Sequence, residues 1–452
     1  MIPGFRNDIL SIKDPNHDKN PDEDNMFLQW QTLFAGLLLS QKMYVNPKSY
    51  CHAFKDWEGQ PVNVLEQMDV EEYLTMFMDR LEAAIKSTPQ EKTIQYHFGG
   101  KFANEVICQT CPCRYTRYEP YLSLGVPVKN KKSFAEGMEA FIAGDLLDQD
   151  NQYYCERCDK KVDALKRTCL AQMPRYLIAT LKRFDFDFDL MIRRKLNDYF
   201  EFQTEIDLKP YTSEYLTQKE QEERKRAEKQ GDADEPMEEI KMKQPAEYYQ
   251  YELVGVVVHA GTADSGHYYS YIKEQETLRI EKEGSAKWYE FNDIFVREFD
   301  PAEIPAECFG GEETSYSSNF NNNDQKLMRM RNAYVLIYKR KLTDESLIVG
   351  DDEPQATAAA ADSSQAQAAS ENAAALFRLG STELQLDPES ALNKKIEWDN
   401  HRYWHIRYLF RDDYQHFVTK ILLYWNTARI VPKVVSWRND DFHLLSQFNA
   451  SC

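Results

Sequence analysis

The sequence has no long hydrophobic run, and its first residues do not have the pattern of a leader peptide. Its longest apolar stretch, LFAGLLL at residues 33–39, is far shorter than the roughly 20 residues that a membrane-spanning helix needs. The first residues, MIPGFRNDIL, have neither the basic start nor the apolar core of a secretory signal. These absences argue against a membrane or secreted protein, and we expect the chain to lie in the cytoplasm or the nucleus.

Positive charge is also scarce. The 452 residues include 55 lysines and arginines against 74 aspartates and glutamates, which gives a formal net charge of −19. This balance argues against a nucleic-acid partner, and it suits either a basic protein partner or simple solubility. With 42% hydrophobic residues the chain can still bury a substantial core, in one large domain or in two to three smaller ones.

Residues 26–86 have the pattern of helices, and residues 69–86 show it most clearly. Asp69 and Glu72 occupy the N-cap and N3 positions of a capping box, and Pro89 follows the expected end. Apolar residues recur along one face at spacings of three and four, namely Val70, Tyr73, Leu74, Phe77, Met78, Leu81 and Ile85.

From about residue 93 the pattern changes to short runs rich in β-branched and aromatic residues. They read FANEVICQTC, YTRYEPYLSLGVPV, YLIATLKRFDFDF, YELVGVVVHA, HYYSYIK, KWYEFND and AYVLIYKR. Because strands and helices do not alternate here, we predict a largely antiparallel sheet beside helices, which is an α+β fold.

Three segments depart from these patterns. Residues 213–247 are dense in charge with almost no apolar periodicity, which predicts a solvated insertion within the domain. Residues 343–380 are rich in alanine, serine and glutamine and are expected to form a linker. Residues 381–452 are expected to form a small helical extension, with apolar positions at Tyr414, Phe417, Val418, Ile421, Leu422 and Trp425.

The chain has nine cysteines, an odd number, and four of them form two C-x-x-C pairs. Each pair, Cys108 with Cys111 and Cys155 with Cys158, can place two thiolates on one side of a tight turn. Together they predict a tetrahedral, structural Zn²⁺ site made by two hairpins. Cys113 is a spare thiol that can compete for a ligand position, and the alternative is that these cysteines are merely buried or unpaired on strand turns.

Residues 259–271, HAGTADSGHYYSY, place His267 after a glycine loop at the end of an apolar run. A lone histidine there is more often an ordinary surface or core residue. Downstream, KWYEFND supplies Asn292 and Asp293, whose amide or carboxylate can accept the imidazole N–H and fix its tautomer. The combination points to a catalytic base with an orienting partner.

Eight stretches spread over residues 1–342 occur in a specific order. They are QMDVEEY, ICQTC, YCERCDKK, LIATLKRFDFD, FEFQTEIDLKPY, LVGVVVHAGTADSGHYYSYI, KWYEFND and NAYVLIYKR. In this order they resemble the catalytic domain of the ubiquitin-specific proteases, and most closely its large fat-facets-like members. The resemblance implies a papain-like fold of thumb, palm and fingers, with the helical thumb part at residues 1–92, fingers and palm at residues 93–342, and zinc bound in the fingers.

The implied activity is hydrolysis of the bond after the C-terminal glycine of ubiquitin, with ubiquitin and ubiquitinated proteins as partners. By motif position His267 is the general base, and Asn292 orients it where many members carry aspartate. Asp293 is then a neighbour in the same polar cluster. An amide oxygen can accept the ring N–H, but it stabilises an imidazolium less than a carboxylate does.

Three further residues are implied at the substrate site. Asp69 and Glu72 match the acidic positions of the family's Gln-x-Asp-x-x-Glu motif, which lies along the channel for ubiquitin's arginine-containing tail. Their helix-capping role is the alternative, and both roles are compatible. Tyr268 is expected beside the base at the lip of the sheet.

The family's nucleophile has no match in this sequence. In relatives an Asn-x-Gly-x-Thr-Cys-Tyr-x-Asn type segment opens a helix ahead of the histidine, and nothing similar occurs here. Cys51 lacks the preceding glycine turn and the oxyanion asparagine, Cys169 and Cys308 belong to other segments, and Cys452 is terminal. We therefore expect the chain as given not to cleave ubiquitin conjugates.

Two explanations of this absence stay open. The sequence is either a fragment of a larger deubiquitinase, incomplete at its N-terminus, or a ubiquitin-binding pseudoenzyme or scaffold that has lost the cysteine. The retention of His267, Asn292 and the glycine loop favours the fragment. Coding sequence ahead of Met1 would decide between them.

Overall fold

The computed structural model describes residues 2–13, 25–64, 66–229, 242–275, 286–315, 325–342, 348, 390–409 and 415–420. The chain divides into two compact units, one of residues 1–21 and 54–385 and the other of residues 22–53 and 386–452. Nearly all of the predicted linker lies outside the described residues. Within the described parts, no helix combines the length and the apolar character needed to cross a bilayer.

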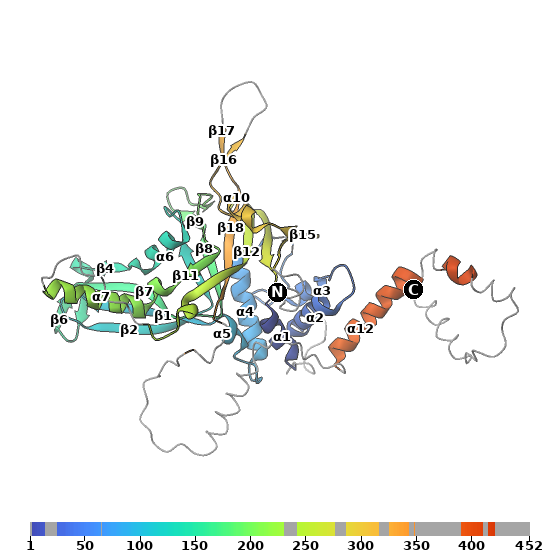
Figure 1. Cartoon of the computed structure of the whole chain (residues 1–452), viewed down its shortest axis with the longest axis horizontal. Helices are drawn as coiled ribbons and strands as arrows, with labels where there is room; N and C mark the ends of the chain where they lie inside the picture. Colours follow the sequence, from blue (N-terminus) through green and yellow to red (C-terminus); the bar gives the residue numbers. More distant parts are fainter. Residues whose placement is uncertain are drawn as a thin grey trace, which may run out of the picture. The chain divides into compact units, whose positions relative to one another are not determined.

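A large sheet forms the centre of the first unit (Figure 1). Its eight strands follow the order β15-β14-β13-β12-β18-β8-β3, with β11 paired to β12. All of its pairs are antiparallel except β3 with β8, so the prediction of a largely antiparallel α+β fold is confirmed. The strands are β3 (Ser123–Pro127), β8 (Tyr176–Lys182), β11 (Glu205–Asp207), β12 (Gln250–Gly261), β13 (Gly266–Lys273), β14 (Trp288–Asn292), β15 (Phe295–Phe299) and β18 (Arg331–Arg340).

The core of this sheet follows from its nearly continuous apolar strands. Six of the seven residues of β8 are buried, as expected for a central strand covered on both faces. Helix α6 (Phe134–Ala143) contributes Phe134 and Met138 to the same core. Each such side chain stabilises the fold by roughly 1.5–3 kcal/mol through burial. A slip of β12 against β13 by one residue would expose their own core side chains, so the core fixes the register of the two strands.

The predicted helical stretch of residues 26–86 is interrupted. It forms α2 (Met26–Leu39), α3 (Lys48–Ala53) and α4 (Val70–Ile85), with prolines at positions 47 and 61 between them. Helix α1 (Pro3–Ser11) packs on α5 (Thr93–Phe98), where His97 Nε2 lies 2.6 Å from the buried Asp8 carboxylate.

Helix α4 begins as predicted, but its capping box is only half formed. Asp69 Oδ1 accepts hydrogen bonds from the N–H groups of Glu71 and Glu72, at 2.7 and 3.3 Å. The reciprocal bond from the Glu72 carboxylate to the Asp69 N–H is not made between these two described residues, and Glu72 is exposed. Its carboxylate is therefore open to other partners.

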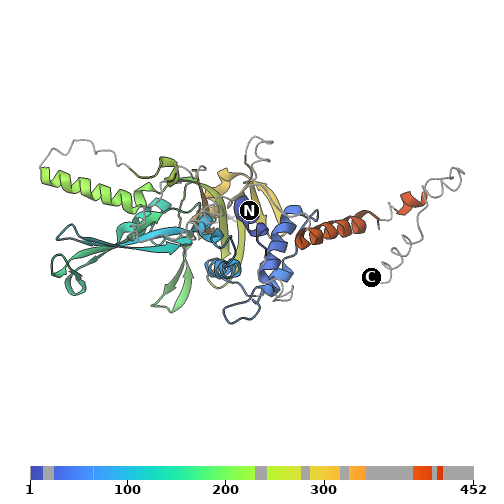
Figure 2. The ribbon, with the colours of Figure 1, turned by 90° about the horizontal axis from the view of Figure 1, so that it is seen from below.

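A second, four-stranded sheet has the order β2-β1-β7-β4 and projects from the central one (Figure 2). Two short strands, β5 (Tyr153–Cys155) and β6 (Lys160–Val162), form a hairpin beside it. We call these six strands the fingers. The larger sheet consists of β1 (Gly100–Cys108), β2 (Arg114–Tyr121), β4 (Asp145–Leu147) and β7 (Ala164–Gln172).

The charge-dense segment is more ordered than predicted. Residues 213–229 form α7 (Ser213–Lys229), which packs on β7, while residues 230–241 lie outside the described residues. A buried carboxylate explains the packing: Glu105 accepts from Arg167 Nε at 2.8 Å and from Ser213 Oγ at 2.6 Å. Glu220 of α7 pairs with Arg114 and Arg167. The charges thus fix part of the insertion to the fingers.

The second unit consists of α2, α3 and α12 (Ala391–Trp404), followed by a π-helical turn at His405–Leu409. Asn400 of α12 donates to Leu39 O at 3.0 Å and accepts from Gln41 N at 2.8 Å. Within the predicted helical extension, the structure describes helical residues at 391–409 and 415–420, while Tyr414, Ile421, Leu422 and Trp425 lie outside the described residues.

Shorter elements complete the first unit. A hairpin of β9 and β10 leaves the central sheet, and a second small hairpin of β16 and β17 precedes β18. Their bounds are β9 (Phe184–Asp187), β10 (Ile192–Lys195), β16 (Glu312–Ser315), β17 (Gln325–Met328), α8 (Ala246–Tyr249) and α10 (Ile304–Cys308), with 3-10 turns at Gln149–Asn151, Lys209–Tyr211 and Pro301–Glu303.

Candidate active site

His267 and Asn292 meet at the ends of two neighbouring strands of the central sheet. His267 is the second residue of β13 and Asn292 is the last residue of the neighbouring β14. The imidazole Nε2 lies 2.8 Å from Asn292 Oδ1. Asp293 follows in the left-handed backbone region, with φ of 52°, and its carboxylate lies 3.7 Å from the same nitrogen. The structure therefore brings together all three residues that the sequence proposed for catalysis.

Glu290 sets the orientation of the Asn292 amide. Its Oε1 accepts from Asn292 Nδ2 at 3.3 Å, and its Oε2 is held by Arg297 Nε at 2.7 Å. Because the amide nitrogen faces Glu290, the amide oxygen faces His267 and must accept a hydrogen bond from Nε2–H. The other ring nitrogen, Nδ1, is then the one that can accept a proton.

The sequence reasoning missed Glu290, although a signal was present. Residues 288, 290 and 292 alternate along β14, so their side chains lie on one face of the strand. Glu290 is only 7% exposed, which is unusual for a carboxylate unless it has partners. Burial of this charge beside Asn292 and Arg297 marks it as part of the polar cluster around His267.

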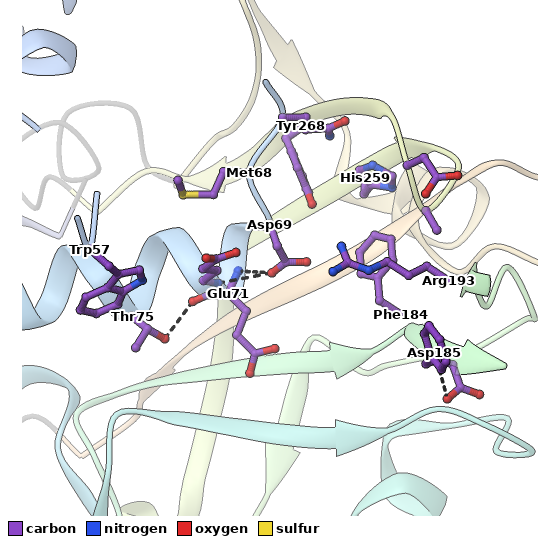
Figure 3. A pocket seen from close by; sticks show the side chains of 15 residues that line it. Trp57, Met68, Asp69, Glu71, Thr75, Phe184, Asp185, Arg193, His259 and Tyr268 are labelled. Atoms are coloured by element: carbon purple, nitrogen blue, oxygen red, sulfur yellow. Dashed lines mark hydrogen bonds between the residues drawn. The ribbon is translucent and has the colours of Figure 1, made fainter. Parts of the chain in front are cut away.

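A cleft of about 870 Å³ is lined by Tyr268, the residue that follows His267 (Figure 3). Asp69, Glu72 and Tyr268, the three predicted substrate-binding residues, all line it. Phe184 and Arg193 lie on its other side. The cleft thus combines carboxylates with aromatic surface, which suits an extended, basic peptide segment.

Asp69 has structural partners in addition to its place in the cleft. Besides capping α4, its two carboxylate oxygens accept from Tyr334 Oη at 3.0 and 2.9 Å. Burial, followed by the negative charge of Asp69, raises the pKa of Tyr268 to about 12, so this phenol stays protonated at neutral pH. The capping role of Asp69 is confirmed, and contact with a substrate tail stays a prediction.

His259 lines the same cleft but has a different character from His267. It is 2% exposed, and its Nδ1 has no hydrogen-bond partner among the described residues. Burial, followed by the nearby Lys195 ammonium, lowers the pKa of His259 to about 4. The ring is therefore neutral at physiological pH, and its centroid lies 4.7 Å from that of Tyr268.

None of the described cysteines forms a hydrogen bond with His267. Cys169 is buried in β7, where desolvation raises its pKa to about 12, and burial also raises the pKa of Cys308. Both are therefore poor sources of thiolate. Cys51 lies half-buried in α3, and Cys452 is outside the described residues.

The four cysteines of the C-x-x-C pairs converge at the end of the fingers. Their sulfur atoms all lie within 4.8 Å of one another, with Cys108 to Cys158 at 3.9 Å and Cys111 to Cys155 at 3.7 Å. Ligand bonds of 2.3 Å in a tetrahedron place sulfurs about 3.8 Å apart, so the spacing fits Zn²⁺.

The surroundings of these sulfurs also suit a metal. Backbone N–H groups of Thr110 and Cys111 each approach Cys108 Sγ at 3.4 Å, which favours a thiolate. The predicted group of four can therefore hold a metal ion. Cys113 packs half-buried against the cluster without belonging to the four, so it stays a spare thiol.

Comparisons with known proteins agree with one another. The family model described as ubiquitin carboxyl-terminal hydrolase matches residues 1–338. The chain is 37% identical over 331 residues to ubiquitin carboxyl-terminal hydrolase 9Y of Mus musculus and 35% identical over 340 residues to the probable ubiquitin carboxyl-terminal hydrolase FAF of Drosophila melanogaster. These alignments cover 70% and 73% of this chain, but the chain spans only 12% of either relative.

A solved structure shares the fold. It is the SAGA Ubp8/Sgf11/Sus1/Sgf73 DUB module bound to ubiquitin aldehyde, with a TM-score of 0.52 at 20% sequence identity. The match covers 73% of this chain and 62% of that chain. The likeness at this identity concerns the arrangement of helices and strands.

Proposed function

Because this chain belongs to the ubiquitin carboxyl-terminal hydrolase family and has the fold of a ubiquitin-specific protease domain, we propose that its cleft binds the C-terminal tail of ubiquitin. In this proposal His267 is the general base for hydrolysis of the bond after ubiquitin's last glycine. The observation that carries the proposal is the 2.8 Å contact between His267 and Asn292 beside the acidic cleft.

The geometry supports a role for each group under this proposal. Asn292 Oδ1 accepts from Nε2–H, so His267 Nδ1 can take the proton of a cysteine thiol. The thiolate would attack the glycine carbonyl, and the imidazolium would return the proton to the departing amine as the C–N bond breaks. Water then hydrolyses the thioester with the same nitrogen as base. The Asn292 amide orients the ring but stabilises the imidazolium less than a carboxylate would.

The chain as given binds ubiquitin under this proposal but does not hydrolyse its conjugates. Cys169 and Cys308 are buried with raised pKa values, and His267 has no cysteine partner among the described residues. Release of a fluorophore from a ubiquitin C-terminal amide is expected to stay at the uncatalysed rate. Turnover that His267→Ala abolishes would instead show that one of the chain's own cysteines is the nucleophile.

Ubiquitin binding tests the cleft directly. Glu72 is exposed and lacks the reciprocal capping bond, so Glu72→Gln should keep the fold while weakening affinity. A charge-assisted bond contributes about 1.5–3 kcal/mol when shielded from water, which corresponds to at least a tenfold loss. Glu82→Gln, an exposed position on the same helix that does not line the cleft, is the matched control. Absence of ubiquitin binding by the unsubstituted chain would refute the proposal.

A catalytically inactive ubiquitin-binding module is the second candidate, favoured by the amide at position 292 and by the raised pKa values of the buried Cys169 and Cys308. Fusing a nucleophile segment from a fat-facets-like relative ahead of Met1 separates the two. Turnover, lost when that segment's cysteine becomes serine, supports an enzyme site. Ubiquitin binding without turnover supports the inactive module.

Three further parts of the proposal concern a metal ion, the binding partners and the place of the protein in the cell. A structural Zn²⁺ would be held by Cys108, Cys111, Cys155 and Cys158, where it would cross-link the fingers and take no part in the reaction. The partners would be ubiquitin and ubiquitinated proteins, with no nucleic acid and no membrane. The protein would work in the cytoplasm or the nucleus.

A further inference from the structure

Lys195 is buried at the end of β12, the strand that pairs with the strand of His267, although nothing in the sequence pattern marked it. It is the last residue of β10 and is 8% exposed. Its Nζ lies 2.7 Å from Met330 O, 2.9 Å from His259 O and 3.3 Å from Gly261 O. Burial, followed by the nearby Arg183 guanidinium, lowers the pKa of Lys195 to about 7. In the protonated form, which the three carbonyls favour, each of the three N–H donors has a backbone carbonyl as acceptor.

The positions of these carbonyls relate Lys195 to the base. In the β12–β13 ladder, His267 lies directly opposite Ala260. Ala260 is flanked by His259 and Gly261, the two β12 residues whose carbonyls Lys195 holds. Lys195 therefore fixes the backbone on both sides of the residue that faces His267.

The third carbonyl joins this end of β12 to the neighbouring strand. Met330 immediately precedes β18, and its carbonyl also accepts from Gly261 N at 3.0 Å. The Lys195 ammonium thus connects the end of β12 to the start of β18, where the regular pairing of these two strands ends.

The turn between β12 and β13, from Gly261 to Gly266, has little freedom to adjust if the end of β12 moves. Gly261 has φ of +140°, and a Cβ at Gly266 would lie 2.4 Å from His259 Nε2. A displacement of the β12 end would therefore be passed to Gly266 and to His267 beside it. Misplacement of a catalytic group by about 1 Å can cost roughly 100-fold in rate.

Lys195 is itself held in place by a buried arginine. Arg183 is fully buried, donates from Nη1 to Leu196 O at 2.9 Å, and accepts from Leu196 N at 2.7 Å through its own carbonyl. Its Nε donates to Ala333 O of β18 at 2.8 Å. The backbone next to Lys195 is therefore fixed to β18, the strand that begins directly after Met330.

We propose that Lys195 is a positioning residue, whose ammonium sets the place of His267 through the carbonyls of His259 and Gly261. This inference rests on the proposed function for the role of His267. It assigns Lys195 no contact with the substrate or the reacting atoms.

The test uses the full chain with ¹⁵N-labelled histidine, because the ring signal of His267 reports its bond to Asn292 directly. Lys195→Met removes the donors and keeps the length of the side chain, while Lys195→Arg keeps donors. Lys182→Met is the matched control, since Lys182 is half exposed and pairs with Glu71 at the surface. Amide hydrogen exchange of residues 259–268 and of the fingers is measured in parallel.

Lys195→Met should raise amide exchange at residues 259–268 at least tenfold and remove the protected Nε2–H signal of His267, with the fingers unchanged. Lys195→Arg should restore the signal, and Lys182→Met should not alter it. An unchanged His267 signal in folded Lys195→Met would overturn the inference. If Lys195→Met does not fold, Lys195→Arg decides: a retained signal supports the inference, and a lost signal in a folded protein overturns it.

These readouts are separate from the test of function. Failure of the unsubstituted chain to bind ubiquitin would remove the proposed function while leaving the effect of Lys195 on the His267 signal measurable. Normal ubiquitin binding with an unaffected His267 signal would remove the role of Lys195 alone.

Discussion

At the scale of single residues, the site depends on two buried polar side chains that support exposed ones. Glu290 is buried and sets the amide of Asn292, and His259 is buried and packs beneath the loop of His267. Polar groups of this kind are costly to bury. We therefore expect measurable effects when Glu290 is replaced and when the pH changes the charge of His259.

The Glu290 side chain should determine which nitrogen of His267 carries the proton. Glu290→Leu removes the acceptor for Asn292 Nδ2 and allows the amide to rotate, so that Nε2 would face a donor and Nδ1 would hold the proton. The ¹⁵N shifts of the ring in labelled protein distinguish the two tautomers. Glu290→Gln keeps an acceptor oxygen and serves as the control. An unchanged tautomer in folded Glu290→Leu would contradict this role.

His259 should make stability depend on pH between about 4 and 6.5. Its pKa is lowered to about 4 in the fold, mainly by burial, so within this window the unfolded chain binds more protons than the folded one. The free energy of unfolding therefore rises with pH there, by up to about 3 kcal/mol for a 2.5-unit shift. Urea unfolding at pH 4.5 and 6.5 measures the difference. His259→Gln should reduce the difference, and an equal slope in both proteins would argue against it.

At the scale of elements, charges and metal ligands stabilise parts that have small apolar cores of their own. The fingers bury only Cys108, Cys155 and Val162 in the cluster at their end. Helix α7 is attached through Glu105, whose carboxylate is 1% exposed. Removing one partner from such a buried ion pair is expected to cost about 3–5 kcal/mol.

Metal removal should loosen the end of the fingers without disturbing His267. We expect one zinc ion per chain in purified protein, and its removal by a chelator should raise amide exchange in β5, β6 and the end of β1, because the four thiolates lose their cross-link. Acidification should also raise amide exchange at the end of the fingers, since protonated thiols do not bind the ion.

Two variants control this experiment. Cys155→Ser should lower the zinc content well below one per chain, whereas Cys113→Ser should keep it. A folded, metal-free protein with unchanged exchange in the fingers would show that the four cysteines have no metal role.

At the scale of the whole molecule, local patterns predicted the elements better than their polar connections. The strand from residue 250 to 261 and the cap at Asp69 follow from short-range periodicity and spacing. The pair His267 and Asn292 is suggested by two neighbouring strand-like segments, and their roles come from the resemblance to a known family. Lys195 could not be found in this way, because only the fold brings it to its three acceptors, two carbonyls of β12 and one directly before β18.

The contacts of the charged insertion and of the C-terminal helix could not be predicted from local sequence patterns either. Residues 213–229 have the composition of a solvated segment, and only the fold reveals that Glu105 and Glu220 pair with Arg114 and Arg167. The partner of α12 is equally invisible in sequence, since Asn400 reaches a carbonyl 361 residues away.

The contact between α12 and α2 should stabilise the second unit. Asn400→Ala removes the bonds to Leu39 O and Gln41 N, which should cost about 1–2 kcal/mol. Urea unfolding and amide exchange of residues 28–42 measure the loss. His401→Ala, an exposed neighbour on α12, is the control and should have little effect. Equal stability of the two variants would show that these bonds do not hold the unit together.

The distance of 361 residues between Leu39 and Asn400 also has a consequence for synthesis. At roughly 5–20 residues per second, a ribosome needs about 20–70 seconds to make the chain between these two positions. During that interval the apolar helix at residues 26–39 has emerged while its partner does not yet exist. Newly made chains should therefore depend on a holding chaperone until translation passes Trp404, and crosslinking to stalled nascent chains of increasing length would show when that dependence ends.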